Sequence, residues 1–170
     1  MIQIAFLKKV DIPTNREIQE TIQKLGYDFK ILNSLEKQID EDGLECIING
    51  YETYFETYIE SSDNALDDHE ADWIKPDITN QDTAISFVWG ADFAASACIG
   101  LISIALIDHC NALIYYMDDE MKYSREMLVN ETPQLFEELK KQSDKIENHE
   151  EVVNPQNKKS LWVKLKNIFK

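Results

Sequence analysis

The residue types best suited to nucleophilic chemistry lie together at Asp108, His109 and Cys110. A cysteine with a nearby histidine can act as a nucleophile with its base. Adjacent residues on a helix point about 100° apart, however, so these side chains would not face each other. A histidine at the C-terminal end of a helix also interacts favourably with the helix dipole, which is a structural role. The triplet therefore favours a helix end over a catalytic pair.

An acidic stretch at residues 63–72 is the candidate for a metal site, because close carboxylates and a histidine are cation ligands. The side chains concerned are Asp63, Asp67, Asp68, His69, Glu70 and Asp72. The stretch lacks the acid spacing and the glycine of a calcium loop. The three histidines follow no zinc-ligand spacing, and the five glycines form no phosphate-binding cluster. We therefore expect no metal, no cofactor and no enzymatic activity.

A binding surface is predicted along residues 51–60, where strand alternation sends one set of side chains to each face. The set suited to a core is Tyr51, Thr53, Phe55, Thr57 and Ile59. The other set is a row of carboxylates and phenols: Glu52, Tyr54, Glu56, Tyr58 and Glu60. Carboxylates and aromatic ring faces both bind Lys and Arg. This row, with Asp67, Asp68 and Glu70 as rim charges, is the predicted partner-binding site; the alternative is a solvated strand that uses Glu for solubility and Tyr for strand propensity.

The charge of the chain is sorted along its length, within a net charge of −15. Residues 158–170 carry five lysines and no acid, which leaves 12 Lys+Arg against 32 Asp+Glu in residues 1–157, a net of −20. So acidic a body repels nucleic acid and attracts basic partners through its long-range field. We therefore expect a protein partner and no nucleic acid.

The basic C-terminal tail, residues 160–170, follows a polar linker at 148–159. Its helical spacing sets apolar side chains among lysines, at Trp162, Lys164, Leu165, Lys166 and Phe169. A basic amphipathic helix of this kind can lie on an anionic membrane surface. Docking of the tail onto the acidic body and a disordered tail are the alternatives. Peripheral membrane contact would make the chain a membrane-surface adaptor or secretion accessory protein.

The composition predicts one packed domain over residues 1–147, because 44% of the chain is apolar. Three cysteines in no metal-type spacing indicate buried free thiols and a reducing compartment, so we expect a soluble, cytoplasmic protein. The longest uncharged run, residues 93–107, is shorter than the roughly 20 residues that cross a bilayer. It predicts a central apolar helix over 92–108, capped by Asp92.

The remaining patterns predict an α+β fold, with helices packed on one face of a mainly antiparallel sheet. A capping box at Thr14–Glu17 begins a helix that Gly26 ends, and Asn49-Gly50 forms the turn of a hairpin. Thr132-Pro133 begins a last helix that runs to about residue 146. A long loop fills residues 61–81, and an acidic turn lies at residues 118–120. Strands are expected at residues 2–7, 27–32, 44–48, 51–59, 83–89 and 112–117.

The block ISFVWGADFAASACIGLISIALIDHCNALIYYMDDE, from Ile85 to Glu120, combines a strand ending in Trp-Gly, an alanine-rich helix and a strand ending in an acidic turn. It resembles a module of the small acidic immunity proteins of bacterial contact-dependent and type VI toxin systems. The resemblance implies a non-enzymatic role in bacterial competition, in which the chain binds and neutralises a cognate toxin domain. Many toxins that attack nucleic acids are basic, and an inhibitor of opposite potential gains association rate and specificity.

Overall fold

The computed structural model describes residues 1–152 of a chain that divides into two units, residues 1–136 and 137–170. The predicted tail at 160–170 lies outside the described residues, together with Trp162, Lys164, Leu165, Lys166 and Phe169. Of the predicted linker at 148–159, residues 148–152 are helical and the rest lies outside the described part of the chain.

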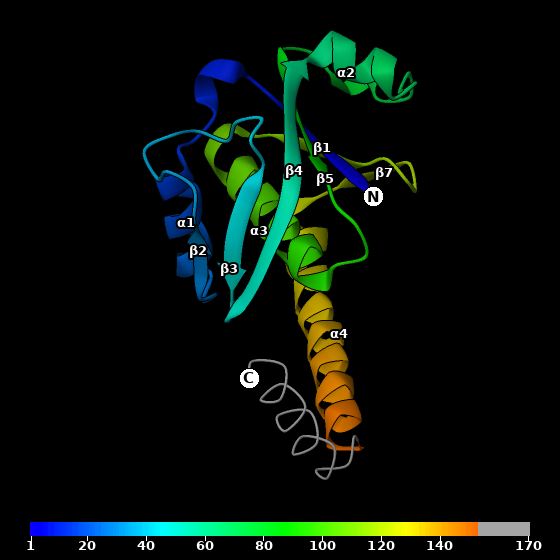
Figure 1. Cartoon of the computed structure of the whole chain (residues 1–170). Helices are drawn as coiled ribbons and strands as arrows, with labels where there is room; N and C mark the ends of the chain where they lie inside the picture. The colour runs from blue at the N-terminus through cyan, green and yellow to red at the C-terminus, as the bar shows by residue number, and fades with distance from the viewer. Residues whose placement is uncertain (153–170) are drawn as a thin grey trace, which may run out of the picture. The chain divides into compact units, whose positions relative to one another are not determined.

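A seven-stranded sheet forms the centre of the first unit (Figure 1). Its strands are β1 (Ile2–Leu7), β2 (Phe29–Ile31), β3 (Leu44–Ile48), β4 (Tyr51–Ser61), β5 (Thr83–Val88), β6 (Leu113–Tyr116) and β7 (Met121–Tyr123). They are arranged in the order β2-β3-β4-β5-β1-β6-β7, and every neighbouring pair is antiparallel. The sheet places the first strand of the chain between the fifth and the sixth, so the N-terminal strand is part of the core.

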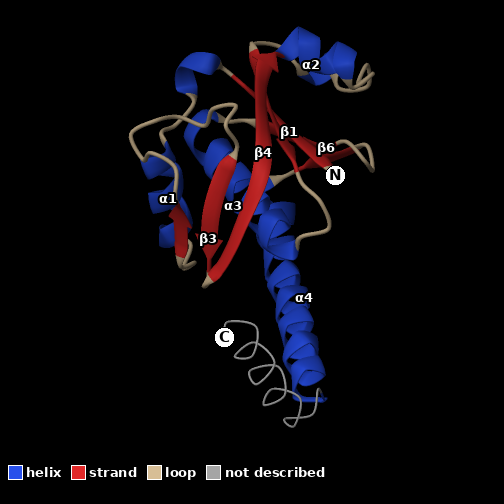
Figure 2. Cartoon of the chain, in the orientation of Figure 1, coloured by secondary structure: helices blue, strands red, loops and turns tan. Residues whose placement is uncertain are grey.

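Four α-helices accompany the sheet (Figure 2). They are α1 (Asn15–Lys24), α2 (Ser62–Asp68), α3 (Phe93–Cys110) and α4 (Arg125–Val152), with short 3-10 turns at Lys9–Asp11 and Lys75–Asp77. Helix α3 contacts β1, β3, β4 and β6 and also packs against α1. The α+β class, the antiparallel sheet and the central apolar helix are therefore confirmed.

Helix α3 is the core element that the apolar run predicts. The Asp92 side chain accepts a hydrogen bond of 2.8 Å from the Ala94 amide at its start, and Asn111 in the left-handed conformation, with φ of 52°, ends it. This helix is long and apolar enough to cross a membrane, but 67% of its residues are buried inside the structure. The Gln3 side chain donates a buried hydrogen bond of 2.6 Å to Ser103, so Gln3 lies on the face of the sheet that α3 covers.

Two local predictions are confirmed residue by residue, one by its hydrogen bonds and one by its backbone angles. Thr14 and Glu17 form the capping box of α1, with 2.7 Å between the Thr14 amide and the Glu17 carboxylate, and Gly26 follows the helix at φ of +97°. Asn49 and Gly50 connect β3 to β4 with φ of 49° and 86°, which is the backbone of a tight hairpin turn. The hairpin register therefore fixes the faces of β4.

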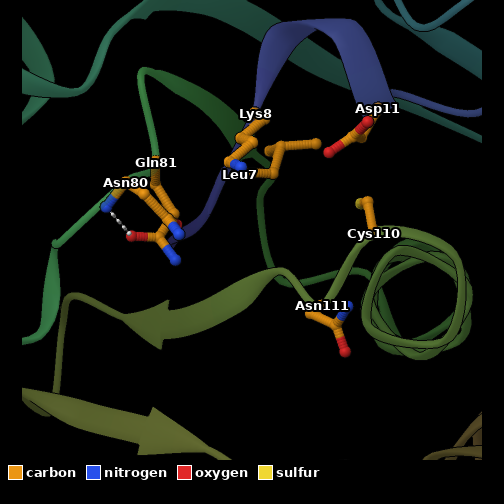
Figure 3. Close-up of a pocket in the computed structure, with 7 residues that line it drawn as sticks. All are labelled: Leu7, Lys8, Asp11, Asn80, Gln81, Cys110 and Asn111. Atoms are coloured by element: carbon orange, nitrogen blue, oxygen red, sulfur yellow. Dashed lines mark hydrogen bonds between the residues drawn. The ribbon is translucent and has the colours of Figure 1, made fainter.

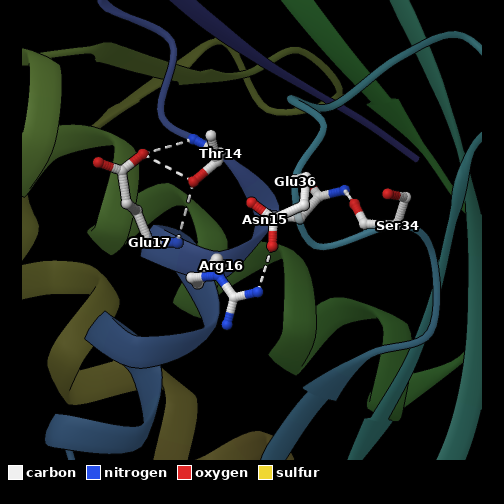
Figure 4. A network of polar contacts seen from close by, with 6 residues as sticks. All are labelled: Thr14, Asn15, Arg16, Glu17, Ser34 and Glu36. Carbon is white, nitrogen blue, oxygen red and sulfur yellow. Dashed lines mark hydrogen bonds and ion pairs between the residues drawn. The ribbon is translucent and has the colours of Figure 1, made fainter.

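Helix α1 is joined to the loop at residues 32–43 by a small polar network (Figure 4). The Asn15 side chain donates 2.9 Å to the Ser34 carbonyl, and Arg16 forms an ion pair with Glu36. These contacts hold the loop that leads into β3, so they support the hairpin from outside the sheet.

The prediction of a loop over 61–81 is wrong in its first part, because residues 62–68 form α2. The Ser61 hydroxyl caps this helix by accepting from the Asn64 amide at 3.2 Å. Ala65 and Leu66 are buried against Ile4 and Phe6 of β1, on the opposite side of the sheet from α3. A pair of apolar residues inside an acidic stretch is a weak helical signal, and packing on the sheet decides the conformation here.

The prediction that Thr132-Pro133 begins the last helix is also wrong. Helix α4 begins at Arg125, after the short strand β7, and Pro133 lies inside it. The Ser124 hydroxyl accepts from the Met127 amide at 3.2 Å and so caps the true start. Thr132 is buried instead, and its hydroxyl donates to the Leu128 carbonyl at 2.7 Å. The Ser124 cap, and not Thr132-Pro133, therefore marks the start of α4.

Candidate functional site

The longest strand, β4, carries the predicted binding surface, and its inner face is bound into the core. Phe55 and Thr57 are each 1% exposed, and the Phe55 ring makes an edge contact with Phe87, with 6.1 Å between ring centroids. Thr53 donates 2.6 Å to Asp92, the residue that caps α3. The inner face thus fixes the position of the strand relative to the central helix.

The outer face of β4 presents the predicted row of acidic and phenolic side chains to solvent. We call the row Glu52, Tyr54, Glu56, Tyr58 and Glu60 the acidic strand face. Tyr54 and Tyr58 are 52% and 48% exposed. In the part of the chain whose side chains are described, none of the three carboxylates forms an ion pair with a lysine or an arginine. The cross-strand neighbour of Tyr54 is Glu45 of β3, which adds another carboxylate beside the row.

Both tyrosines of the acidic strand face are held in place by neighbours. The Tyr58 hydroxyl donates 2.6 Å to Glu56, and this hydrogen bond raises the pKa of Tyr58 above its usual range. The Tyr54 ring lies so close to Gly43 that a β-carbon added there would be 2.6 Å from the Tyr54 hydroxyl oxygen. Gly43 has a φ of +80°, so glycine is required there by both its backbone and the close approach of the ring. Aromatic side chains that are already oriented lose less entropy when they bind a partner.

The three predicted rim charges separate in the structure. Asp68 borders a groove with Glu60. Asp67 instead forms an ion pair with Lys75, with 3.6 Å between Nζ and the carboxylate. Glu70 is exposed, follows the end of α2 with a φ of 50°, and does not border the groove. Of the three, only Asp68 therefore extends the acidic strand face.

The groove between β4 and α2 has a volume of about 430 Å³. Sequence reasoning missed five of the residues that line it: Glu41, Ile59, His69, Ser86 and Val88. Strand alternation assigns Ile59 to the core-facing set. His69 lies in the acidic stretch, whose pattern indicates a candidate metal ligand and not a partner contact. Glu41 is near because the Thr57 hydroxyl donates to the neighbouring Asp40 carbonyl, a contact between distant residues that no local pattern indicates.

The Asp108–Cys110 triplet ends α3, and its side chains have separate partners. His109 Nε2 lies 2.8 Å from the Thr21 hydroxyl of α1, whereas the Cys110 thiol donates to the Leu106 carbonyl at 2.9 Å. Asp108 forms an ion pair with Arg125, at 2.6 Å.

Cys110 borders a small polar pocket of about 150 Å³ (Figure 3), and burial raises the pKa of the Cys110 thiol to about 11. A thiol with so high a pKa is a poor nucleophile at neutral pH.

Metal coordination finds no support in the geometry. Among the described residues, no group of three or more His, Cys, Asp and Glu side chains is arranged to hold a metal ion. Cys46 and Cys98 are buried free thiols.

Comparisons of the chain with protein-family models, with curated proteins and with solved structures found no match.

Proposed function

We propose that this chain is a non-enzymatic immunity protein that binds and neutralises a basic toxin domain in the cytoplasm. The observation that carries the proposal is the acidic strand face: carboxylates and half-exposed tyrosines in one row, without a described cation to balance them. A protein that used these acids only for solubility would need no oriented tyrosines between them. Lys and Arg side chains of a partner fit this row by ion pairing and by stacking on the rings.

The net charge supports the same proposal over a longer range. A net of −15 attracts a basic partner before contact. The acidic strand face, whose carboxylates have no lysine or arginine partner among the described residues, provides the place where the partner docks. Inhibition then requires no chemistry, since carboxylates on the inhibitor occupy the surface with which a basic toxin would bind phosphates.

Affinity capture tests this proposal. The tagged chain is used as bait at low ionic strength, and bound proteins are identified by mass spectrometry. We expect a basic protein in stoichiometric amount that salt releases, whose expression arrests growth unless this chain is co-expressed. The matched baits are Glu52→Lys/Glu56→Lys, on the acidic strand face, and Glu20→Lys/Glu126→Lys, which makes the same change in net charge at exposed positions elsewhere. Equal recovery by both variants, or growth arrest that co-expression does not relieve, would contradict the proposal.

A second candidate function rests on the sequence of the tail, which has the pattern of a basic amphipathic helix. It is a membrane-surface adaptor or secretion accessory protein. Co-sedimentation with anionic vesicles, with and without residues 158–170, distinguishes it from the immunity protein. Vesicle binding that is lost with the tail favours the adaptor, and binding that does not depend on the tail rules this mechanism out.

A further inference from the structure

The groove between β4 and α2 has the chemistry of a binding site for a single cationic side chain. Three carboxylates border it, Glu41, Glu60 and Asp68, and among the described residues neither lysine nor arginine does. Glu60 and Asp68 line the same groove, and burial together with the Asp68 carboxylate raises the pKa of Glu60. A bound cation would relieve this repulsion.

An unsatisfied hydroxyl at the same groove is an independent indication of a ligand. Ser86 borders the groove and is 2% exposed, and its hydroxyl has no hydrogen-bond partner among the described residues. In the strand register it lies between Ile4 of β1 and Tyr58 of β4. A buried polar group without a partner costs free energy, and a ligand that supplies the partner recovers that cost. Tyr58, which is 48% exposed and is held by its hydrogen bond to Glu56, borders the same groove.

We infer that this groove binds an arginine side chain of the basic partner. The guanidinium forms a planar fork of donors, which suits the two adjacent carboxylates of Glu60 and Asp68, and one further donor reaches the Ser86 hydroxyl. The Tyr58 ring provides a face on which the guanidinium stacks. The inference rests on the proposed function for the source of the arginine, and it identifies the groove as the anchoring point of the acidic strand face.

The test is a titration of the isotope-labelled full chain with N-acetyl-arginine-N-methylamide. Binding is monitored through the chemical shifts of the backbone amides. The matched control ligand is the citrulline analogue, which has the same shape without the charge. We expect saturable shifts at Glu60, His69 and Ser86 with the arginine compound and none with the citrulline compound. Equal shifts with both compounds, or shifts that spread over all acidic surfaces without saturation, would overturn the inference.

Single substitutions test which residues of the groove bind the arginine compound. Asp68→Asn is expected to weaken binding about tenfold, as for the loss of one charge-assisted hydrogen bond. Asp67→Asn removes the same charge one residue away and should change binding less than twofold, because Asp67 is paired with Lys75. Ser86→Ala should weaken binding without lowering the urea midpoint, since the hydroxyl has no hydrogen-bond partner in the described part of the chain. Equal losses from Asp67→Asn and Asp68→Asn, or unchanged binding by Ser86→Ala, would overturn the assignment.

The result also separates this inference from the proposed function. Saturable arginine binding in the groove, without a protein partner in the capture experiment, keeps the groove assignment and removes the immunity role. A captured partner that depends on Glu52 and Glu56, together with no saturable arginine binding, overturns only the groove assignment.

Discussion

The inner and outer faces of strand β4 share one backbone but differ in how their polar groups are satisfied. On the inner face, the hydroxyls of Thr53 and Thr57 donate to Asp92 and to the Asp40 carbonyl, and Phe55 is buried beside them. On the outer face, the carboxylates of Glu52 and Glu56 have no described cationic partner. Strand alternation therefore separates the side chains that stabilise the fold from those of the proposed binding surface, so each set can be changed with little effect on the other.

The largest expected effect comes from breaking the inner face. Phe55→Ala should lower the free energy of unfolding by about 3–5 kcal/mol, because it leaves a cavity between β4 and α3. Tyr54→Ala, at the adjacent position on the outer face, should cost less than about 1 kcal/mol, since the ring is half exposed. Urea unfolding measures both variants. Similar losses at the two positions would show that the faces are not energetically separate.

A smaller effect is expected at the glycine that supports the outer face. Gly43→Ala should cost about 1–2 kcal/mol from its left-handed backbone and should also displace the Tyr54 ring. Gly26→Ala is the matched control, because Gly26 has a φ of +97° but nothing within 4 Å of an added β-carbon. Urea unfolding should report similar losses for both variants. Only Gly43→Ala should weaken partner binding, and equal binding by the two would remove Tyr54 from the interface.

The smallest effect concerns the pH dependence of the free protein. The raised pKa of Glu60 means that the folded state binds its proton more tightly than the unfolded state, so ionised Glu60 destabilises the fold. This cost is present above the raised pKa and is removed as the pH falls below the ordinary value of 4.5. Glu60→Gln should therefore slightly increase stability at neutral pH, as measured by thermal unfolding, and should weaken arginine binding.

The pKa of Glu17 is shifted in the opposite direction to that of Glu60. Hydrogen bonds from Thr14 lower the pKa of Glu17, so its stabilising contribution is present above the ordinary value of 4.5 and is lost as the pH falls through the lowered pKa. Glu17→Gln should lower stability at neutral pH and have little effect in strong acid. A loss of stability at neutral pH from Glu60→Gln as well would contradict the assignment of Glu60 to a desolvated, repulsive site.

The parts of the fold that the sequence predicts well are those with local causes. The Asn49-Gly50 turn and the Thr14–Glu17 capping box depend on residues within one turn of each other, and alternation from the hairpin places the acidic strand face on one side of β4. The groove could not be predicted in the same way. It depends on α2, which forms because Ala65 and Leu66 pack on β1, and on residues from distant parts of the chain.

The rate at which the chain associates with its captured basic partner, measured at several salt concentrations, tests whether the partner docks on the acidic strand face. We expect association of the natural chain to slow steeply as salt rises, because steering between opposite charges is screened. Glu52→Lys/Glu56→Lys should associate about tenfold or more slowly at low salt. Glu20→Lys/Glu126→Lys, with the same net charge, should stay close to the natural chain. Equal rates for the two variants at every salt concentration would show that the acidic strand face is not where the partner docks.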